Sequence, residues 1–174
     1  MKIRPATIND LATLAQLEKT HLNAELLSDS EKMLGQGFSL NDLKSFLNYG
    51  WIVVAEVDSN IVGYVIAADW KAFTHWPIYK SILKHVSLEH PQFSDKNSCQ
   101  YGPIWIHQNH RGHSIFEQLV AEIKRLSSSQ YQHMITFIAE ENQHSYFAHT
   151  KKGKMQVLDF FEFEDRGYYL LSLK

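Results

Sequence analysis

Two apolar stretches joined by a three-residue polar turn constrain the fold more than any other feature of this sequence. The stretches "WIVVAEV" (51–57) and "IVGYVIAAD" (61–69) are rich in β-branched residues, and only "DSN" separates them. This pattern predicts two antiparallel strands joined by a tight turn. A second hairpin is expected at 155–173, where "EDRG" separates "MQVLDFFEF" from "YYLLSL".

Single strands and helices alternate between the two hairpins. Strands are predicted for "YGPIWIH" (101–107), where Pro103 limits the entry, and for "HMITFIAE" (133–140). A helix is predicted for 75–91, because one Pro lies near its start and another follows its end. The best-supported helix is 115–126, since its apolar residues recur at helical spacing on one face and charged residues occupy the other.

The remaining segments add one strand, one loop and three helices. The helix over 39–50 has the clearest boundaries, because Ser39 and Asp42 have the spacing of a capping box and Gly50 follows as a stop. The others are a strand at 2–5, a helix within 7–22 capped by Asn9, a loop at 31–38 and a short helix within 142–153.

This order of elements favours an α/β fold with one mixed sheet. Hairpins supply antiparallel strands, whereas a strand–helix–strand connection supplies a parallel pair, so a fully parallel sheet is disfavoured. We expect a central sheet of about six to seven strands with helices on both faces. The length of 174 residues suits a single domain spanning residues 1–174.

Composition excludes several classes of protein. The net charge is -2, which gives no basic face of the kind that binds nucleic acid. The N-terminus lacks the apolar run of a signal peptide, and no stretch approaches the roughly 18 apolar residues of a membrane span. Cys99 is the one cysteine and cannot form an internal disulfide, which suits a reducing compartment. We therefore expect a cytoplasmic monomer or homodimer without a nucleic-acid or membrane partner.

A polar bend separates strand from helix in "IWIHQNHRGHSIFEQLV" (104–120). The first N–H groups of the helix lack intrahelical partners and carry the positive end of its dipole, so they suit a phosphate. Arg111 adds a positive charge, and Gly112 permits backbone conformations that other residues resist. The alternative is an ordinary loop in which Ser114 caps the helix. Spacing alone leaves both interpretations open.

Three histidines of this bend, His107, His110 and His113, are spaced three apart. Imidazole is a favoured zinc ligand, but these positions span a strand end and a loop, and no Cys or carboxylate accompanies them at ligand spacing. We expect no metal here. The histidines are expected to be solvated, or one of them to contact a phosphate.

At this bend the sequence resembles the GCN5-related N-acetyltransferase (GNAT) superfamily. "RGHSIF" (111–116) occupies the place of the family signature Arg/Gln-x-x-Gly-x-Gly/Ala, and "NQHSYFAH" (142–149) follows its Asn-x-x-Ala-x-x-x-Tyr pattern. The order of elements over nearly the whole chain also resembles that family, and within it an uncharacterised bacterial subgroup. Two positions depart from the signature, since Ser114 and Phe116 stand where the family has small residues.

The resemblance implies acetyl-coenzyme A as the donor. Its pyrophosphate is expected on the bend, its pantetheine arm along the strand, and further contacts on the short helix. Lys residues within "KKGK" (151–154) are either a solvated turn or a contact to the 3′-phosphate. The expected coenzyme-binding residues are Ile104, Trp105, Ile106, Arg111, Gly112, His113, Ser114, Ile115, Phe116, Asn142, Ser145 and His149.

The resemblance also implies direct attack of a primary amine on the thioester in a ternary complex. His149 stands where the family has its acidic Tyr, so it is expected to protonate the departing sulfur. Glu140 and Glu141 follow a buried strand and are expected to act as the base through a water, or else are solvated. The acceptor pocket is expected to be lined by Trp70, Trp76 and Tyr101.

The expected function is acetyl transfer to a small amine, a peptide N-terminus or a lysine. Two alternatives remain open. Ser114 and Phe116 are compatible with a catalytically weak GNAT-fold module that binds or senses coenzyme A. An unrelated α/β nucleotide binder is disfavoured, because the chain lacks both a full Gly-x-Gly-x-x-Gly pattern and a phosphate-loop Lys.

Overall fold

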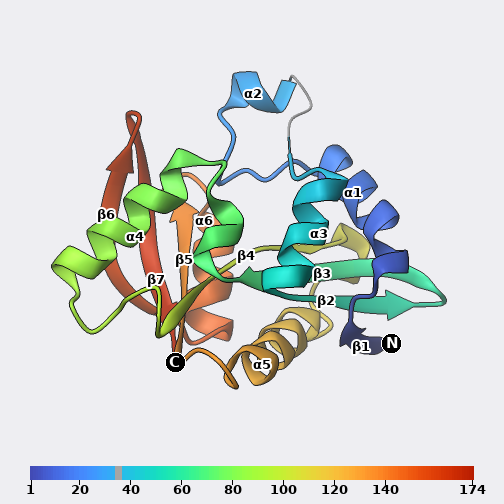
Figure 1. The fold of residues 1–174 in the computed structure, drawn as a ribbon. Helices are drawn as coiled ribbons and strands as arrows, with labels where there is room; N and C mark the ends of the chain where they lie inside the picture. The colour runs from blue at the N-terminus through green and yellow to red at the C-terminus, as the bar shows by residue number, and fades with distance from the viewer. Residues whose placement is uncertain (34–36) are drawn as a thin grey trace.

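Seven strands form one twisted sheet at the centre of the molecule (Figure 1). The computed structural model describes residues 1–33 and 37–174. Only β4 and β5 pair in parallel, and the other neighbouring strands are antiparallel. The sheet order is β1-β2-β3-β4-β5-β7-β6. This confirms the predicted mixed sheet. The strands are β1 (Lys2–Pro5), β2 (Gly50–Val57), β3 (Asn60–Ala68), β4 (Ser98–Ile106), β5 (His133–Ala139), β6 (Gln156–Phe163) and β7 (Arg166–Leu173).

Helices cover both faces of the sheet, as predicted. Figure 1 shows α1, α3 and α4 on one side and α5 on the other. The element after α6 is a π-helical turn over Ala148–Lys152. None of the helices in the described ranges is long and apolar enough to cross a bilayer. The helices are α1 (Leu11–Thr20), α2 (Asp29–Met33), α3 (Leu40–Tyr49), α4 (Pro77–Glu89), α5 (Ile115–Ser127) and α6 (Gln143–Phe147).

The sheet separates two apolar layers. We call the first the α3 layer, which packs α1, α3 and α4 on the sheet, and the second the α5 layer, which packs α5 on the opposite face. Because successive strand residues point to opposite faces, neighbours on one strand belong to different layers. The α3 layer includes Leu14, Phe46, Tyr64, Tyr79, Ile82 and Phe137. The α5 layer includes Tyr101, Phe116, Leu119, Ile123, Ile138 and Leu171.

Local signals fix most element boundaries. Ser39 accepts a hydrogen bond from the Asp42 amide at 3.2 Å, and Asp42 accepts one from the Ser39 amide at 2.7 Å, so the predicted capping box is present. The expected cap at Asn9 is wrong. Thr7 and Asp10 form a capping box on a short 3₁₀ turn that precedes α1, and Asp10 also binds Arg4.

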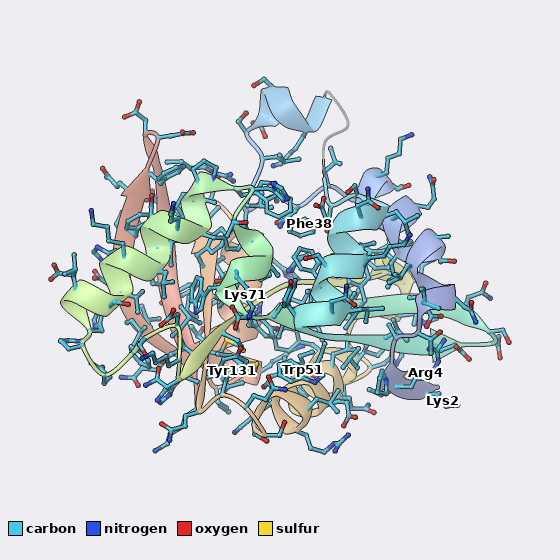
Figure 2. All side chains as sticks on the ribbon, viewed as in Figure 1. Lys2, Arg4, Phe38, Trp51, Lys71 and Tyr131 are labelled. Carbon is cyan, nitrogen blue, oxygen red and sulfur yellow. The ribbon has the colours of Figure 1, made fainter. Side chains whose placement is uncertain are left out.

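Arg4 fastens the start of α1 to the sheet. Its guanidinium binds Asp10 at 2.8 Å and Glu56 of β2 at 2.6 Å (Arg4 is labelled in Figure 2).

Two further predictions of element boundaries need correction. Residues 31–33 belong to α2 rather than to a loop, and 34–36 lie outside the described residues. Strand β4 begins at Ser98, three residues earlier than expected, because residues 98–100 pair with β5.

Strand β4 has a bulge opposite β3 and then separates from β5, and these two features create the space for a site. Ala67 pairs with Tyr101 and Val65 with Ile104, so β4 has one extra residue here, and Pro103 lies within the bulge rather than at the strand entry. Strands β4 and β5 pair only over 98–100 and then part. In Figure 1, β2, β3 and β4 lie across the view, whereas β5, β6 and β7 lie roughly upright.

Candidate active site

A cavity of about 570 Å³ is lined by both strands beyond the point where β4 and β5 part. Its lining includes residues of both apolar layers, such as Tyr64 and Phe137 of the α3 layer and Tyr101 and Phe116 of the α5 layer. The cavity therefore passes from one face of the sheet to the other. A ligand in it would contact the bend before α5 at one end and α1 at the other.

The bend before α5 has the features of an anion site. Gly112 and Ser114 both adopt positive φ angles, 83° and 57°. The Ser114 side chain makes no capping hydrogen bond, so the interpretation of Ser114 as an ordinary helix cap is wrong. The N–H groups of the first turn of α5 thus remain available to a ligand.

Three cationic side chains line the cavity, and the sequence places them on two segments. Arg111 belongs to the bend, and its Nε donates a hydrogen bond to the Ile106 carbonyl at 3.2 Å. Lys151 and Lys152 belong to the π-helical turn after α6. A Cβ built on Gly112 meets no atom within 4 Å, so the space beside the bend is open. This end of the cavity suits a ligand with several negative charges.

Phe116 turns inward, as its place on the apolar stripe predicts. Its side chain is 8% exposed and belongs to the α5 layer with Leu119 and Val120. The ring meets the His149 imidazole edge to face, with 5.0 Å between the ring centroids. The bulky residue therefore packs behind the bend and forms part of the cavity wall instead of projecting across it.

His149 is buried and holds a fixed tautomer. Its Nδ1 lies 2.7 Å from the Ser145 carbonyl oxygen, which can only accept a hydrogen bond, so the proton resides on Nδ1. Its Nε2 lies 3.2 Å from the Tyr101 hydroxyl and therefore accepts from it. Burial lowers the pKa of His149 to about 4. At neutral pH this imidazole is uncharged.

Glu18 of α1 lines the opposite end of the cavity. Its side chain is 1% exposed, and Oε1 has no hydrogen-bond partner within the described part of the chain. Burial raises the pKa of Glu18 to about 8, while a hydrogen bond from Tyr64 opposes that rise. A buried carboxyl with a pKa near neutrality, open to a cavity, has the properties of a general base.

Glu25 is a second carboxylate on this side. Its Oε1 accepts a hydrogen bond from Asn142 Nδ2 at 2.6 Å, and its Oε2 accepts one from the Ala139 amide at 3.1 Å. Burial raises the pKa of Glu25. Burial and the charges of Glu18 and Glu25 also raise the pKa of Tyr79, so both carboxylates lie near that ring.

Arg166 holds the segment that carries Glu25. Its guanidinium donates hydrogen bonds to the carbonyl oxygens of Ala24, Glu25 and Leu27, and its Nε donates one to Glu141 at 2.7 Å. The segment between α1 and α2 has little regular structure of its own, so these bonds fasten it to the start of β7.

Comparison with known proteins places this arrangement in a known fold. No family model and no curated protein matches the sequence. A ribosomal-protein-alanine N-acetyltransferase from Brucella melitensis is 17% identical over 99% of each chain, with a TM-score of 0.67. The putative acetyltransferase yncA from Salmonella typhimurium, solved with acetyl-CoA, is 16% identical over 100% of this chain and 93% of its own, with a TM-score of 0.66.

A GNAT superfamily phosphinothricin acetyltransferase from Sinorhizobium meliloti, in complex with AcCoA, adds a third case. It is 16% identical over 99% of this chain and 86% of its own, with a TM-score of 0.62. The chain has the GNAT fold. The likeness extends over nearly the full length, so the order of elements expected from the sequence is confirmed.

Most of the residues expected to bind the coenzyme line one cavity of this GNAT fold, and His113 does not. Asn142, Ser145 and His149 lie on one side of α6 and its π-helical turn, as their spacing predicts, since Ser145 contacts both of the others. Asn142 has a protein partner for each polar atom of its side chain, which are Glu25 and the Ser145 amide. It therefore joins α6 to Glu25.

The expected base and two of the expected pocket residues lie elsewhere in the GNAT fold. Glu140 and Glu141 are exposed and do not line the cavity, and Glu141 pairs with Arg166. Trp70 is buried against Ser98, to which its Nε1 donates a hydrogen bond at 3.1 Å, and Trp76 packs on the Phe38 ring. Neither tryptophan lines the cavity, whereas Tyr101 does.

Sequence reasoning missed Glu18 and Glu25. The signal for Glu18 was its position, since it follows Leu14 by four residues on the apolar face of α1, where a charged side chain is unusual. Glu25 carried no comparable signal, because its partners come from distant parts of the chain. No cluster of three or more metal-ligating side chains occurs among residues 1–33 and 37–174.

Proposed function

We propose that this protein is an N-acetyltransferase that moves an acetyl group from acetyl-coenzyme A to a primary amine in a ternary complex. One observation carries the proposal: a single cavity contains a phosphate-type bend with three cations and also a buried, unpartnered carboxylate. The bend with its cations suits the phosphates of the donor, and the buried carboxylate suits the amine acceptor. Two structural neighbours were solved with acetyl-coenzyme A, which supports the same donor here.

The donor's phosphates would bind at the bend. The first N–H groups of α5, together with Arg111, Lys151 and Lys152, offer donors and positive charge to a polyanion. The pantetheine arm would run along Ile104 and Ile106, whose side chains belong to the α5 layer and line the cavity. This direction brings the thioester toward Tyr101.

Glu18 would act as the base. With a pKa of about 8, its ionised fraction at neutral pH accepts a proton from the incoming ammonium and passes it to solvent. The freed amine nitrogen then attacks the thioester carbon, the C–N bond forms and the C–S bond breaks. The proton that the nitrogen loses as it becomes an amide neutralises the departing thiolate, so coenzyme A leaves as the thiol. A backbone N–H beside the β4 bulge would stabilise the negative charge on the carbonyl oxygen.

Tyr101 would donate a hydrogen bond to the departing sulfur. An ordinary thiol has a pKa of about 8.5 and a tyrosine of about 10, and burial raises the pKa of Tyr101 further. Complete proton transfer from Tyr101 is therefore uphill, and its hydroxyl acts as a hydrogen-bond donor to the thiolate. His149 positions that hydroxyl by accepting from it in the resting state. The direct acid role expected for His149 is disfavoured, because its one N–H is bonded to Ser145.

Release of free thiol from acetyl-coenzyme A, measured with a panel of amines, tests the proposal. We expect amine-dependent thiol release by the parent protein. The double variant Arg111→Ala with Ser114→Asp should bind coenzyme A much more weakly by calorimetry, because it removes a cation and places a negative charge at the helix N-terminus. Coenzyme binding without turnover on any amine would instead favour a sensing module, and stabilisation by ATP or NAD but not coenzyme A would favour a nucleotide binder.

A further inference from the structure

The part of the cavity that faces α1 has an excess of hydrogen-bond acceptors. Glu18 Oε1 and Gln100 Oε1 are the two buried side-chain atoms without a partner in the described part of the chain, and both residues line this cavity. Their side chains are 1% and 2% exposed. Leaving a buried polar atom unpaired is unfavourable, so a ligand that supplies N–H donors would satisfy both oxygens.

The orientation of Gln100 is fixed by its other bond. Its Nε2 donates to the Tyr101 carbonyl at 2.8 Å, and a carbonyl cannot donate in return, so the amide oxygen is the free atom. Gln100 lies between Cys99 and Tyr101, which both belong to the α5 layer, so its side chain points to the α3 side with Glu18. The two unpaired acceptors therefore face the same part of the cavity.

The walls of this part are aromatic. Tyr64, Tyr79, Trp105 and Phe137 line the cavity and belong to, or pack against, the α3 layer. Tyr64 and Trp105 lie with 5.9 Å between ring centroids. Aromatic faces attract cations, and the attraction is strongest where water is excluded. A ligand with an alkyl stem and ammonium groups matches both the walls and the acceptors.

The carboxyl groups in this part of the cavity favour a cation. Glu18 and Glu25 line this part, whereas the Lys and Arg residues of the lining are Arg111, Lys151 and Lys152, on the bend and the π-helical turn. Arg166 lies near Glu25 but is bonded to Glu141 and to backbone carbonyls, and it does not line the cavity. His21 stacks on Trp105 with 4.6 Å between the ring centroids. Burial lowers the pKa of His21, and the charges of His107 and Arg111 lower it further, which keeps the ring neutral.

We infer that the acceptor is a diamine or polyamine without a carboxylate group. This inference rests on the proposed function and names its acceptor class. One amino group is acetylated beside Glu18, while a second, charged ammonium group binds among Glu25, Gln100 and the aromatic walls. An amine with a carboxylate in place of that ammonium is rejected, because the carboxylate would face the carboxyl group of Glu25 and the unpaired amide oxygen of Gln100.

Three amines that share one methylene chain test this inference: 1,5-diaminopentane, hexylamine and 6-aminohexanoate. They end in an ammonium, a methyl and a carboxylate group, respectively. We expect kcat/KM for the diamine to exceed that for hexylamine by at least about ten-fold, the effect of one charge-assisted hydrogen bond, and the carboxylate to be the poorest acceptor. The series is run at several chain lengths, because the spacing of the acceptors sets the best one.

Two variants and one binding measurement make the outcome decisive. Glu25→Gln and Gln100→Met should each shrink the ratio of kcat/KM for diamine to hexylamine, whereas exposed Glu140→Gln should leave the ratio unchanged. Calorimetry on protein saturated with coenzyme A gives the same comparison without turnover. Equal use or equal binding of the three amines overturns the inference and leaves the acetyltransferase proposal standing. Failure to bind acetyl-coenzyme A removes the acetyltransferase proposal itself.

Discussion

The hydroxyl of Tyr101 lies 3.2 Å from Nε2 of His149, although the two residues are 48 positions apart in the chain. The tautomer of His149 makes the tyrosine the donor, and the Phe116 ring packs on the imidazole. Both residues line the cavity, and an uncharged histidine holds the tyrosine hydroxyl. Family resemblance pointed to His149 as the acid, whereas these hydrogen bonds favour Tyr101 as the proposed hydrogen-bond donor to the departing sulfur.

Tyr101→Phe should lower kcat by about 10²-fold, because the thiolate loses its hydrogen-bond donor, with little change in coenzyme affinity. His149→Phe should cost less, since Tyr101 remains, and His149→Gln should recover most of the loss because its amide oxygen again accepts from Tyr101. Steady-state kinetics and calorimetry with coenzyme A separate the two roles. A larger loss for His149→Phe than for Tyr101→Phe would contradict this assignment.

Ser114 carries backbone strain at the anion site. Its φ of 57° lies in the left-handed region, which costs a non-glycine residue roughly 1–2 kcal/mol, and its hydroxyl makes no compensating cap. Ser114→Gly should therefore stabilise the protein by about 0.5–1 kcal/mol after the entropy cost of glycine is counted. Urea denaturation of Ser114→Gly beside Ser114→Ala measures this. Ala keeps the strain, so a Ser114→Gly protein that is less stable than Ser114→Ala, by about the 0.5–1 kcal/mol entropy cost of glycine, would show that the backbone conformation costs nothing.

Phe116 should matter more to stability than to coenzyme binding. Its ring is buried with Leu119 and Val120, so Phe116→Ala should cost about 3–5 kcal/mol of unfolding free energy. Phe116→Leu should cost less, because it fills much of the same volume. Chemical denaturation gives both values, and calorimetry gives the affinity for coenzyme A. Tighter binding by a fully stable Phe116→Ala protein is the outcome that contradicts an inward-facing ring.

The features that sequence predicts well here are those encoded locally. The Ser39 capping box lies within four residues, and the apolar stripe of α5 lies within one helix, so periodicity and spacing were enough to find them. The bend before α5 was recognised for the same reason. Gly112 has a positive φ angle, which is the conformation that glycine was expected to allow there. Ser114 also has a positive φ angle, a conformation that is common for glycine and uncommon for other residues.

The features that sequence missed depend on contacts between distant segments. Glu25 meets Asn142 at a separation of 117 residues, and Arg166 meets the Ala24 carbonyl at a separation of 142. The cavity itself follows from the early parting of β4 and β5, which depends on strand pairing. Glu140 and Glu141 follow a buried strand, but the chain turns outward there and Arg166 neutralises Glu141.

Glu18 gives a prediction in which stability and activity change in opposite directions. Its pKa is raised from 4.5 to about 8, so in the folded protein the carboxyl keeps its proton over a pH range where the unfolded chain has lost it. The folded state thus binds more protons between about pH 4.5 and 8, and stability falls as pH rises through that window, by at most about 1.4 kcal/mol per pH unit.

Glu18→Gln replaces the carboxyl with an uncharged group of the same shape. Its unfolding free energy should match that of the parent near pH 4.5 and exceed it increasingly toward pH 8, as measured by urea denaturation across this range. Its kcat should nevertheless fall by about 10²-fold or more, because the base is lost. In the parent, kcat should rise with pH and level off above about 8, where Glu18 is ionised. An active Glu18→Gln protein would assign the base to another group, whereas an unchanged pH dependence of stability would show that Glu18 is ionised in the folded state.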